Sequence, residues 1–264
     1  MVFCLCALCG KVMLMKNIIF LNKKEGETPL GALENFRARN VKYKDAKMTY
    51  AGRLDPMASG LLLLLSGEEI KNKEKYLNLE KEYEFEVLFG FGTDTYDILG
   101  KVVSSSARGV LAEKKELEKQ IKKNIKSFMG EQVQKYPMYS SKTVLGKPLF
   151  AYARLGEGVA IPERKITIKK IKFIKIKELN NKKLLTNIEK RIGKVRGDFR
   201  QDEILRLWRK TLNVKHSVFN IGSFKISCSS GTYVRVVANS LGEKFGIPAL
   251  AFSIKRTKIG KYVI

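Results

Sequence analysis

The order of apolar and polar residues along the chain predicts strands in five places. A short apolar run at 17–23 predicts a strand, and five consecutive leucines at 61–65 favour a strand buried on both faces. In 81–89 and 224–228 every second residue is apolar, which predicts strands with one buried face. The leucine run is too short to span a membrane, although a buried helical turn would have the same pattern. The segment 166–176, rich in isoleucine and lysine, predicts either one bulged strand or a pair of strands.

Apolar residues three or four positions apart predict four helices. The first follows Thr28-Pro29, a capping residue with proline at the first helical position, and the last ends at Gly246. The apolar positions that define the helices are, in chain order, Leu30, Leu33 and Phe36; Leu117, Ile121, Ile125 and Phe128; Ile204, Leu205 and Trp208; and Val234, Val237, Leu241 and Phe245. Together with the strands, these helices predict an α/β (α+β) fold.

Charge adds more to this interpretation than composition does. The 264 residues are 44% apolar, which is ordinary for a globular chain with an ample core. However, 51 lysines and arginines against 26 acidic residues give a formal charge of +25, which favours a polyanionic partner, most simply a nucleic acid. A lysine-rich surface that only solvates the chain would give the same excess, and we interpret most lysines of the predicted helix at 117–128 in that way.

Few residues suit a metal site. The sequence has one histidine, His216, and three clustered cysteines, Cys4, Cys6 and Cys9, whereas a closed zinc site needs four ligands. Reduced cysteines of a cytoplasmic chain are the simpler interpretation, so we predict no metal. The apolar start has no basic segment before it and no cleavage site after it. We therefore interpret 1–16 as an N-terminal extension from a misplaced start codon rather than as a signal peptide.

The candidate chemistry lies in the polar segment 50–60, directly before the leucine run. Its one acidic residue, Asp55, stands between Gly52 and Gly60, which allow tight turns or a close approach to a ligand. A carboxylate held in this way can act as a nucleophile or a general base. Asp55 followed by Pro56 is also typical of a helix N-cap with proline at the first helical position, an alternative without catalytic meaning.

The stretch that begins at Gly52 reads Gly-Arg-Leu-Asp-Pro-Met-Ala-Ser-Gly-Leu-Leu and resembles the catalytic loop of the pseudouridine synthases, in which the aspartate is essential. The Asp-Pro pair, the small residues and the glycine resemble the TruB branch, which modifies the T-loop of transfer RNA. Arg53 before Leu54 is more familiar from the ribosomal-RNA branches, and Tyr50 stands where TruB proteins have a histidine. The loop therefore indicates the superfamily better than the branch.

Later segments, in the family's order, resemble TruB. Tyr83 follows a lysine by two residues and precedes a polar turn at 90–97 with the sequence Thr-Asp-Thr, as in a TruB motif whose tyrosine lies over the target base. Basic residues and tyrosines alternate in 134–156, which suits phosphate contact with base stacking and resembles the TruB segment that grips RNA as a thumb. Gly231 to Arg235 reads Gly-Thr-Tyr-Val-Arg, a TruB motif whose arginine pairs with the catalytic aspartate. A cation in the first turn of a helix also needs an acidic partner, because it opposes the helix dipole.

The resemblance implies a pseudouridine synthase domain at 17–264, built on a mixed, mostly antiparallel sheet, with the thumb at about 130–156. Residues 181–217 are an insertion relative to the TruB pattern, and no room remains after Ile264 for the PUA domain that many TruB proteins carry. The implied reaction is the conversion of U55 in the T-arm of tRNA to pseudouridine, without a cofactor, by a cytoplasmic monomer.

The resemblance also implies roles for individual residues. Asp55 would be the nucleophile, Arg235 would keep its carboxylate ionised and aimed, and Tyr83 would stack on the uracil and could handle a proton. Tyr50 could stack in the gap that the flipped base leaves. Further substrate contacts are expected from Gly52, Arg53, Leu54, Asp94, Tyr139, Lys142, Tyr152, Arg154, Ile254 and Arg256. A ribosomal-RNA pseudouridine synthase and a non-catalytic RNA-binding or tRNA-folding protein remain alternatives.

Overall fold

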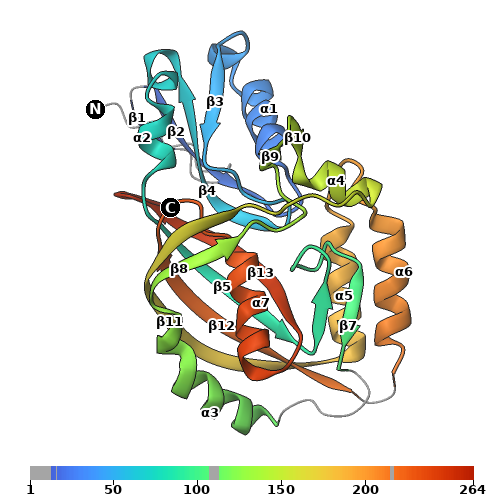
Figure 1. The fold of residues 1–264 in the computed structure, drawn as a ribbon. Coiled ribbons are helices and arrows are strands. Elements are labelled where there is room, and N and C mark those ends of the chain that lie inside the picture. Colours follow the sequence, from blue (N-terminus) through green and yellow to red (C-terminus); the bar gives the residue numbers. More distant parts are fainter. Residues whose placement is uncertain (1–12, 16, 107–112, 215–216) are drawn as a thin grey trace.

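One large sheet organises the fold. The computed structural model describes residues 13–15, 17–106, 113–214 and 217–264. Ten strands of these residues form the sheet, in the order β1-β2-β4-β13-β5-β12-β11-β8, with β3 beside β4 and β14 beside β13 (Figure 1). The ten strands are β1 (Met13–Met15), β2 (Ile18–Lys23), β3 (Met48–Ala51), β4 (Ala58–Ser66), β5 (Lys81–Phe89), β8 (Gly130–Lys135), β11 (Glu163–Asn180), β12 (Val218–Cys228), β13 (Ala249–Ile259) and β14 (Tyr262–Val263).

The sheet is mixed and mostly antiparallel, which confirms the expected fold class. Among the described strands its pairings are antiparallel except for one, in which β13 runs parallel to β4. Ile254 lies opposite Ala58 and Arg256 lies opposite Gly60 in this parallel contact. The contact therefore brings the C-terminal part of the chain beside the loop that precedes β4.

The leucine run lies at the centre of β4, and all five side chains are fully buried. Leu61, Leu63 and Leu65 belong to one apolar cluster, and Leu62 and Leu64 belong to another that includes the inner side of α1. Because the two clusters lie on opposite faces, β4 is a strand buried on both sides, as predicted, and the helical alternative is wrong.

Helices cover both faces of the other half of the sheet. α3 and α7 pack on the face of β5 that carries Phe85 and Val87, whereas α5 and α6 pack on the opposite face, against Leu88 and Ile221 (Figure 1). Trp208 of α6 is fully buried, and its Nε1 donates a hydrogen bond of 3.1 Å to the carbonyl oxygen of Ile98. The α-helices are α1 (Pro29–Arg39), α2 (Lys73–Leu77), α3 (Lys114–Asn124), α4 (Leu149–Leu155), α5 (Asn181–Ile192), α6 (Gln201–Leu212) and α7 (Val234–Phe245).

Three sequence-based interpretations are wrong in detail. Leu30 is 58% exposed, because the buried side of α1 consists of Ala32, Leu33 and Phe36. The polar turn expected over 90–97 occupies only 94–95: the segment also contains the short strand β6 (Phe91–Thr93), which pairs with β7 (Val102–Ser105), and most of its residues are buried. Asp55 caps no helix, since a turn at 56–57 leads directly into β4.

The two ends of the sheet give further detail. β1 pairs with β2, so the sheet begins inside the segment interpreted as an N-terminal extension. The clustered cysteines and the one histidine lie outside the described residues. The segment 166–176 belongs to a single strand, β11, whose register with β12 shifts twice, which agrees with the bulged alternative. None of the helices in the described part of the chain has the length and apolar character needed to cross a bilayer.

Candidate active site

Asp55 lies in a tight loop between β3 and β4. Gly52 and Gly60 have φ angles of +79° and +104°, which glycine adopts without strain. A Cβ atom on Gly60 would lie 2.2 Å from the carbonyl oxygen of Arg256, so only glycine lets β4 and β13 approach this closely. The loop is therefore fixed by its backbone, and it leaves the side chain of Asp55 36% exposed.

Two buried cations bind the backbone of this loop. Arg256 is 1% exposed and donates three hydrogen bonds of 2.8 to 3.3 Å to carbonyl oxygens at 52, 53 and 61. Lys23 is fully buried and donates a bond of 2.6 Å to the carbonyl oxygen of Ala58. Burial lowers the pKa of Lys23 to about 8. Both cations thus stabilise the shape of the loop on either side of Asp55.

Arg235 pairs with Asp55, as the sequence predicted. Its Nε lies 2.7 Å from Asp55 Oδ2 and its Nη2 lies 3.2 Å from Asp55 Oδ1, so the guanidinium contacts both carboxylate oxygens. The remaining donors reach the carbonyl oxygens of Thr95, at 2.5 Å, and Tyr139, at 3.2 Å. The side chain of Arg235 is only 3% exposed. Although burial disfavours its charge, Asp55 and Asp97 raise the pKa of Arg235 above its ordinary value.

Asp97 is a second carboxylate beside Arg235, and sequence reasoning missed it. Asp97 Oδ2 lies 3.8 Å from Arg235 Nε, while Asp97 Oδ1 accepts hydrogen bonds from Thr95 Oγ1, at 2.7 Å, and from the backbone N–H of Leu99, at 2.9 Å. Burial raises the pKa of Asp97 to about 6, with Arg235 opposing the rise and Asp55 adding to it. Its signal in the sequence is the second aspartate of Thr-Asp-Thr-Tyr-Asp, which reads as part of a polar turn.

Tyr83 projects from β5 toward the same site. Its side chain belongs to the core cluster that also contains Leu54 and Ile254, and it is 8% exposed. Burial raises the pKa of Tyr83 to about 12, so the phenol is protonated at neutral pH. A protonated, buried phenol can stack on a planar ligand and donate a hydrogen bond.

These side chains open into a pocket with a volume of about 780 Å³, which is within the usual range for small-ligand sites. Twelve of the fourteen site residues expected from the sequence line it: Tyr50, Gly52, Arg53, Leu54, Asp55, Tyr83, Tyr139, Lys142, Arg154, Arg235, Ile254 and Arg256. The other two, Asp94 and Tyr152, do not. Asp94 binds Arg200, and Tyr152 donates its hydroxyl to the carbonyl oxygen of Val144 at 3.1 Å.

The rim of the pocket is basic and aromatic. A small hairpin of β9 (Thr143–Val144) and β10 (Lys147–Pro148) and the helix α4 follow the segment that carries Tyr139. Lys142 lies with its Nζ 5.5 Å from the ring centre of Tyr136, and Arg154 Nη2 donates a bond of 2.6 Å to the carbonyl oxygen of Asp198. Guanidinium and ammonium groups beside aromatic rings suit phosphate contact and base stacking.

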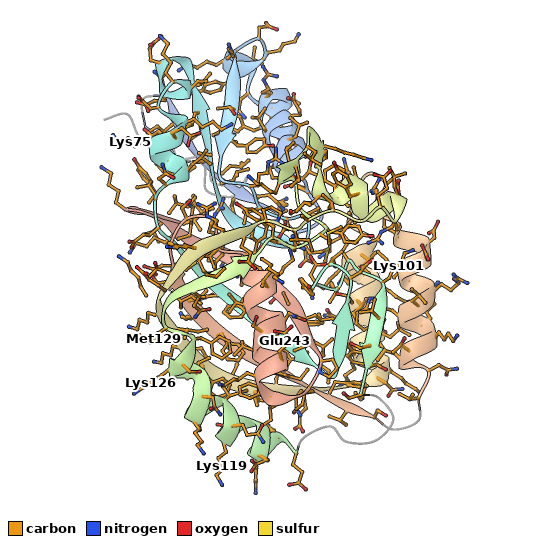
Figure 2. The ribbon with its side chains drawn as sticks, viewed as in Figure 1. Lys75, Lys101, Lys119, Lys126, Met129 and Glu243 are labelled. Carbon is orange, nitrogen blue, oxygen red and sulfur yellow. The ribbon has the colours of Figure 1, made fainter. Side chains whose placement is uncertain are left out.

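Other lysines lie far from this pocket. Lys119 of α3 and Lys126 of the 3-10 turn that follows it (Ile125–Phe128) project outward, on the side of the molecule away from the hairpin and α4 (Figure 2). Their position fits the interpretation of the α3 lysines as a solvated face. The residues that face the pocket are thus a small part of the overall positive charge.

Comparison with solved structures identifies the fold. A chain in "Crystal Structure of a Cbf5-Nop10-Gar1 Complex" matches with a TM-score of 0.53 at 16% identity, over 93% of this chain and 49% of that chain. A chain in "Structure of H/ACA RNP bound to a substrate RNA containing 2'-deoxyuridine" matches with a TM-score of 0.52 at 16% identity, over 93% of this chain and 48% of that chain. This chain therefore spans about half of either match, and the likeness shows a shared fold.

Comparison with protein families identifies the class. The model of the TruB family pseudouridylate synthase (N terminal domain) matches residues 39–195. The chain is therefore a pseudouridylate synthase. The tRNA pseudouridine synthases B of Ligilactobacillus salivarius and Clostridium kluyveri are 30% and 31% identical to it, each over 95% of this chain and 69% of the relative. The chain belongs to the TruB family, and the resemblance seen in its motifs is confirmed.

Proposed function

We propose that this protein converts U55 in the T-loop of tRNA to pseudouridine and that Asp55 is its nucleophile. The observation that carries the proposal is the pair of Asp55 and Arg235, in which a buried guanidinium holds both oxygens of a carboxylate that faces the pocket. Relatives named tRNA pseudouridine synthase B support tRNA as the substrate.

The proposed reaction needs a carboxylate that is held in one direction. In the isomerisation the bond from C1′ to N1 of uridine breaks, the uracil turns, and a bond from C1′ to C5 replaces it. C5 loses its proton and N1 gains one, so the reaction is balanced without an external reactant. A covalent adduct to Asp55 would retain the substrate while the bonds exchange, and Arg235 would keep the carboxylate aimed at it.

The target nucleotide has to leave its stack to reach Asp55, because the bonds that change are otherwise enclosed in the folded loop. In the proposed complex Tyr83 stacks on the flipped uracil and its protonated phenol donates a hydrogen bond. Leu54 and Ile254 line the apolar part of the pocket. Tyr50, at the pocket edge, would fill the gap that the base leaves in the RNA.

The RNA outside the flipped base would be held by the thumb, at about residues 130–156. Lys142 and Arg154 lie on the rim and are suited to phosphate groups of a T-arm. Because every side chain named for the reaction comes from one chain, we expect a monomer to be sufficient, acting in the cytoplasm. The segment 181–217 is the insertion relative to the family pattern.

The test is to compare wild-type protein with Asp55→Asn on a T-arm stem-loop. The amide keeps the shape of the carboxylate and lacks its nucleophilicity, so pseudouridine formation should be abolished while RNA affinity stays within a few fold. Asp45→Asn, which removes the same charge from an exposed position, is the matched control and should retain wild-type turnover.

Each other outcome favours a named alternative. Appreciable pseudouridine formation by Asp55→Asn would remove the nucleophile assignment. Wild-type activity on a ribosomal-RNA fragment but not on the stem-loop would favour a ribosomal-RNA synthase. Binding of the stem-loop without any turnover by wild-type protein, together with unchanged pseudouridine in tRNA from cells that lack the gene, would favour a non-catalytic RNA-binding protein.

A further inference from the structure

The segment between α5 and α6, residues 193–200, reaches the active site from the insertion. Where the segment leaves α5, it packs against the loop between β2 and α1, which carries Glu25 and Gly26. Arg191 binds Glu25 with an Nη2 to Oε2 distance of 2.7 Å, and a Cβ on Gly26 would lie 2.6 Å from the carbonyl oxygen of Lys194. Gly26 in turn donates its N–H to the carbonyl oxygen of Pro56 at 2.8 Å. The insertion is therefore packed against a loop that contacts the neighbour of Asp55.

The tip of this segment presents Arg200. Its backbone has a φ of +63°, a left-handed conformation that is uncommon for arginine and costs free energy. Local hydrogen bonds compensate: Gln201 accepts the N–H of Phe199 at 2.8 Å and donates to the carbonyl oxygen of Gly197 at 2.7 Å. The loop thus imposes one direction on the Arg200 side chain, which is only 16% exposed.

The guanidinium of Arg200 bridges two residues of the catalytic domain. Its Nη1 lies 2.7 Å from Asp94 Oδ2 and 2.6 Å from the hydroxyl oxygen of Tyr139. Its central carbon also lies 4.1 Å from the centre of the Tyr139 ring, which adds a cation–π contact. Such a planar, partly buried contact fixes both partners more firmly than an exposed ion pair does.

Both partners of Arg200 adjoin the groups that orient Arg235. The carbonyl oxygen of Tyr139 accepts a bond of 3.2 Å from Arg235, and that of Thr95, the residue after Asp94, accepts one of 2.5 Å. These two carbonyl oxygens and the carboxylate of Asp55 take the hydrogen bonds that the structure gives to the Arg235 guanidinium. Arg200 therefore contacts the side chains of two residues whose own carbonyl oxygen, for Tyr139, or neighbouring one, for Asp94, accepts a bond from Arg235.

We propose that Arg200 is a positioning residue for the reaction, through which the insertion holds Tyr139 and Asp94, and so the Arg235–Asp55 pair, in place before RNA binds. The proposal rests on the function proposed above. Arg200 acts through other residues and is not assigned a contact with the reacting atoms. In this proposal the segment 193–200 holds the thumb, through Tyr139, against the loop that carries Asp94.

The test compares Arg200→Gln with Arg206→Gln. Arg206 is an exposed residue of α6 outside the pocket lining, so its substitution removes the same charge from the helix that follows Arg200. With a T-arm stem-loop at saturating concentration, Arg200→Gln should lower the single-turnover rate by about 10- to 100-fold, because displacements of about 1 Å at a reacting group have effects of that size. Its Kd should differ from that of Arg206→Gln by less than about threefold, and Arg206→Gln should retain the wild-type rate.

A second measurement needs neither RNA nor turnover. Amide hydrogen exchange of the free protein should become faster in 136–142 for Arg200→Gln and stay unchanged for Arg206→Gln. Asp94→Asn, which keeps the shape and removes the charge, should shift the rate and the exchange in the same direction and serves if Arg200→Gln folds poorly.

Two results would overturn the proposal. One is a single-turnover rate for Arg200→Gln equal to that of Arg206→Gln, and the other is unchanged exchange in 136–142. A wild-type protein that forms no pseudouridine would refute the proposed function instead. In that case the exchange measurement alone decides whether Arg200 holds the Tyr139 segment.

Discussion

Replacing Arg235 with lysine keeps the charge of the side chain and removes its geometry. The guanidinium makes two bonds to Asp55, of 2.7 and 3.2 Å, and one each to the carbonyl oxygens of Thr95 and Tyr139. These acceptors lie on three sides of the group. An ammonium is a point charge with three donors on one nitrogen, so it cannot serve all of these directions at once.

The expected magnitude follows from these contacts. A buried acceptor left without a donor costs about 1–3 kcal/mol, so Arg235→Lys should lower the free energy of unfolding by that amount and still fold. The larger effect is on the direction of the Asp55 carboxylate. A misplacement of about 1 Å reduces rates by about 100-fold, which is about 2.7 kcal/mol of transition-state stabilisation. Arg235→Ala should be worse, since it removes the cation altogether, both from Asp55, which is 36% exposed, and from the buried Asp97.

The assay is the single-turnover rate of tritium release from C5-labelled uridine in a T-arm stem-loop, because C5 loses its hydrogen when the new glycosidic bond forms. Kd is measured in parallel by fluorescence anisotropy. Arg235→Lys should release tritium about 100-fold more slowly with a Kd within a few fold of wild type. A near-wild-type rate at saturating RNA, with affinity lost in both variants in step with charge, would mean that Arg235 contacts phosphate and does not orient Asp55.

Two further predictions concern pH and salt. Because burial raises the pKa of Asp97 from 3.8 to about 6, the native state binds this proton more tightly than the unfolded state, and the free energy of unfolding should fall by about 3 kcal/mol as the pH rises from about 4 to about 6. Asp97→Asn should abolish this fall, and equal slopes of unfolding free energy against pH for the two proteins would contradict the prediction. Affinity for a T-arm stem-loop should fall steeply with salt, and Lys142→Ala and Arg154→Ala should each make the slope of log affinity against log salt concentration shallower by about 0.7 to 0.9. An unchanged slope in both variants would show that the rim does not contact phosphate.

The parts of the fold that sequence predicts are those that a local pattern favours strongly. Five consecutive leucines favour a strand buried on both faces, and β4 is one. The start of α1 is equally local: Thr28 Oγ1 accepts the N–H of Gly31 at 3.0 Å, as its capping role requires. The prediction for the segment 90–97 was wrong because the segment is both polar and buried. Its hydroxyl groups bond internally, as when Thr93 Oγ1 donates to the carbonyl oxygen of Asp97 at 2.7 Å, and composition does not reveal such a network.

The candidate site was predictable where a motif is continuous in the sequence. The loop around Asp55 and the helix start at Arg235 each indicated their own residues. The position of Arg235 at a helix N-terminus predicted an acidic partner, and the resemblance to TruB identified that partner as Asp55. The role of Arg256 was harder to predict. Its place in the pocket wall was expected from the family resemblance, but its donors bind backbone carbonyl oxygens, which a sequence does not display.

Arg200 shows a further reason why sequence reasoning falls short. It lies 106 residues from Asp94 and 61 from Tyr139, and neither spacing belongs to a local pattern. Both partners are polar groups beside a site, and a partly buried carboxylate is costly unless a cation pairs with it. Any segment that places a cation at this position therefore stabilises the fold and, through Tyr139 and Thr95, orients Arg235. A segment outside the catalytic motifs can acquire such a role without changing any of them, which is why the motifs alone did not predict it.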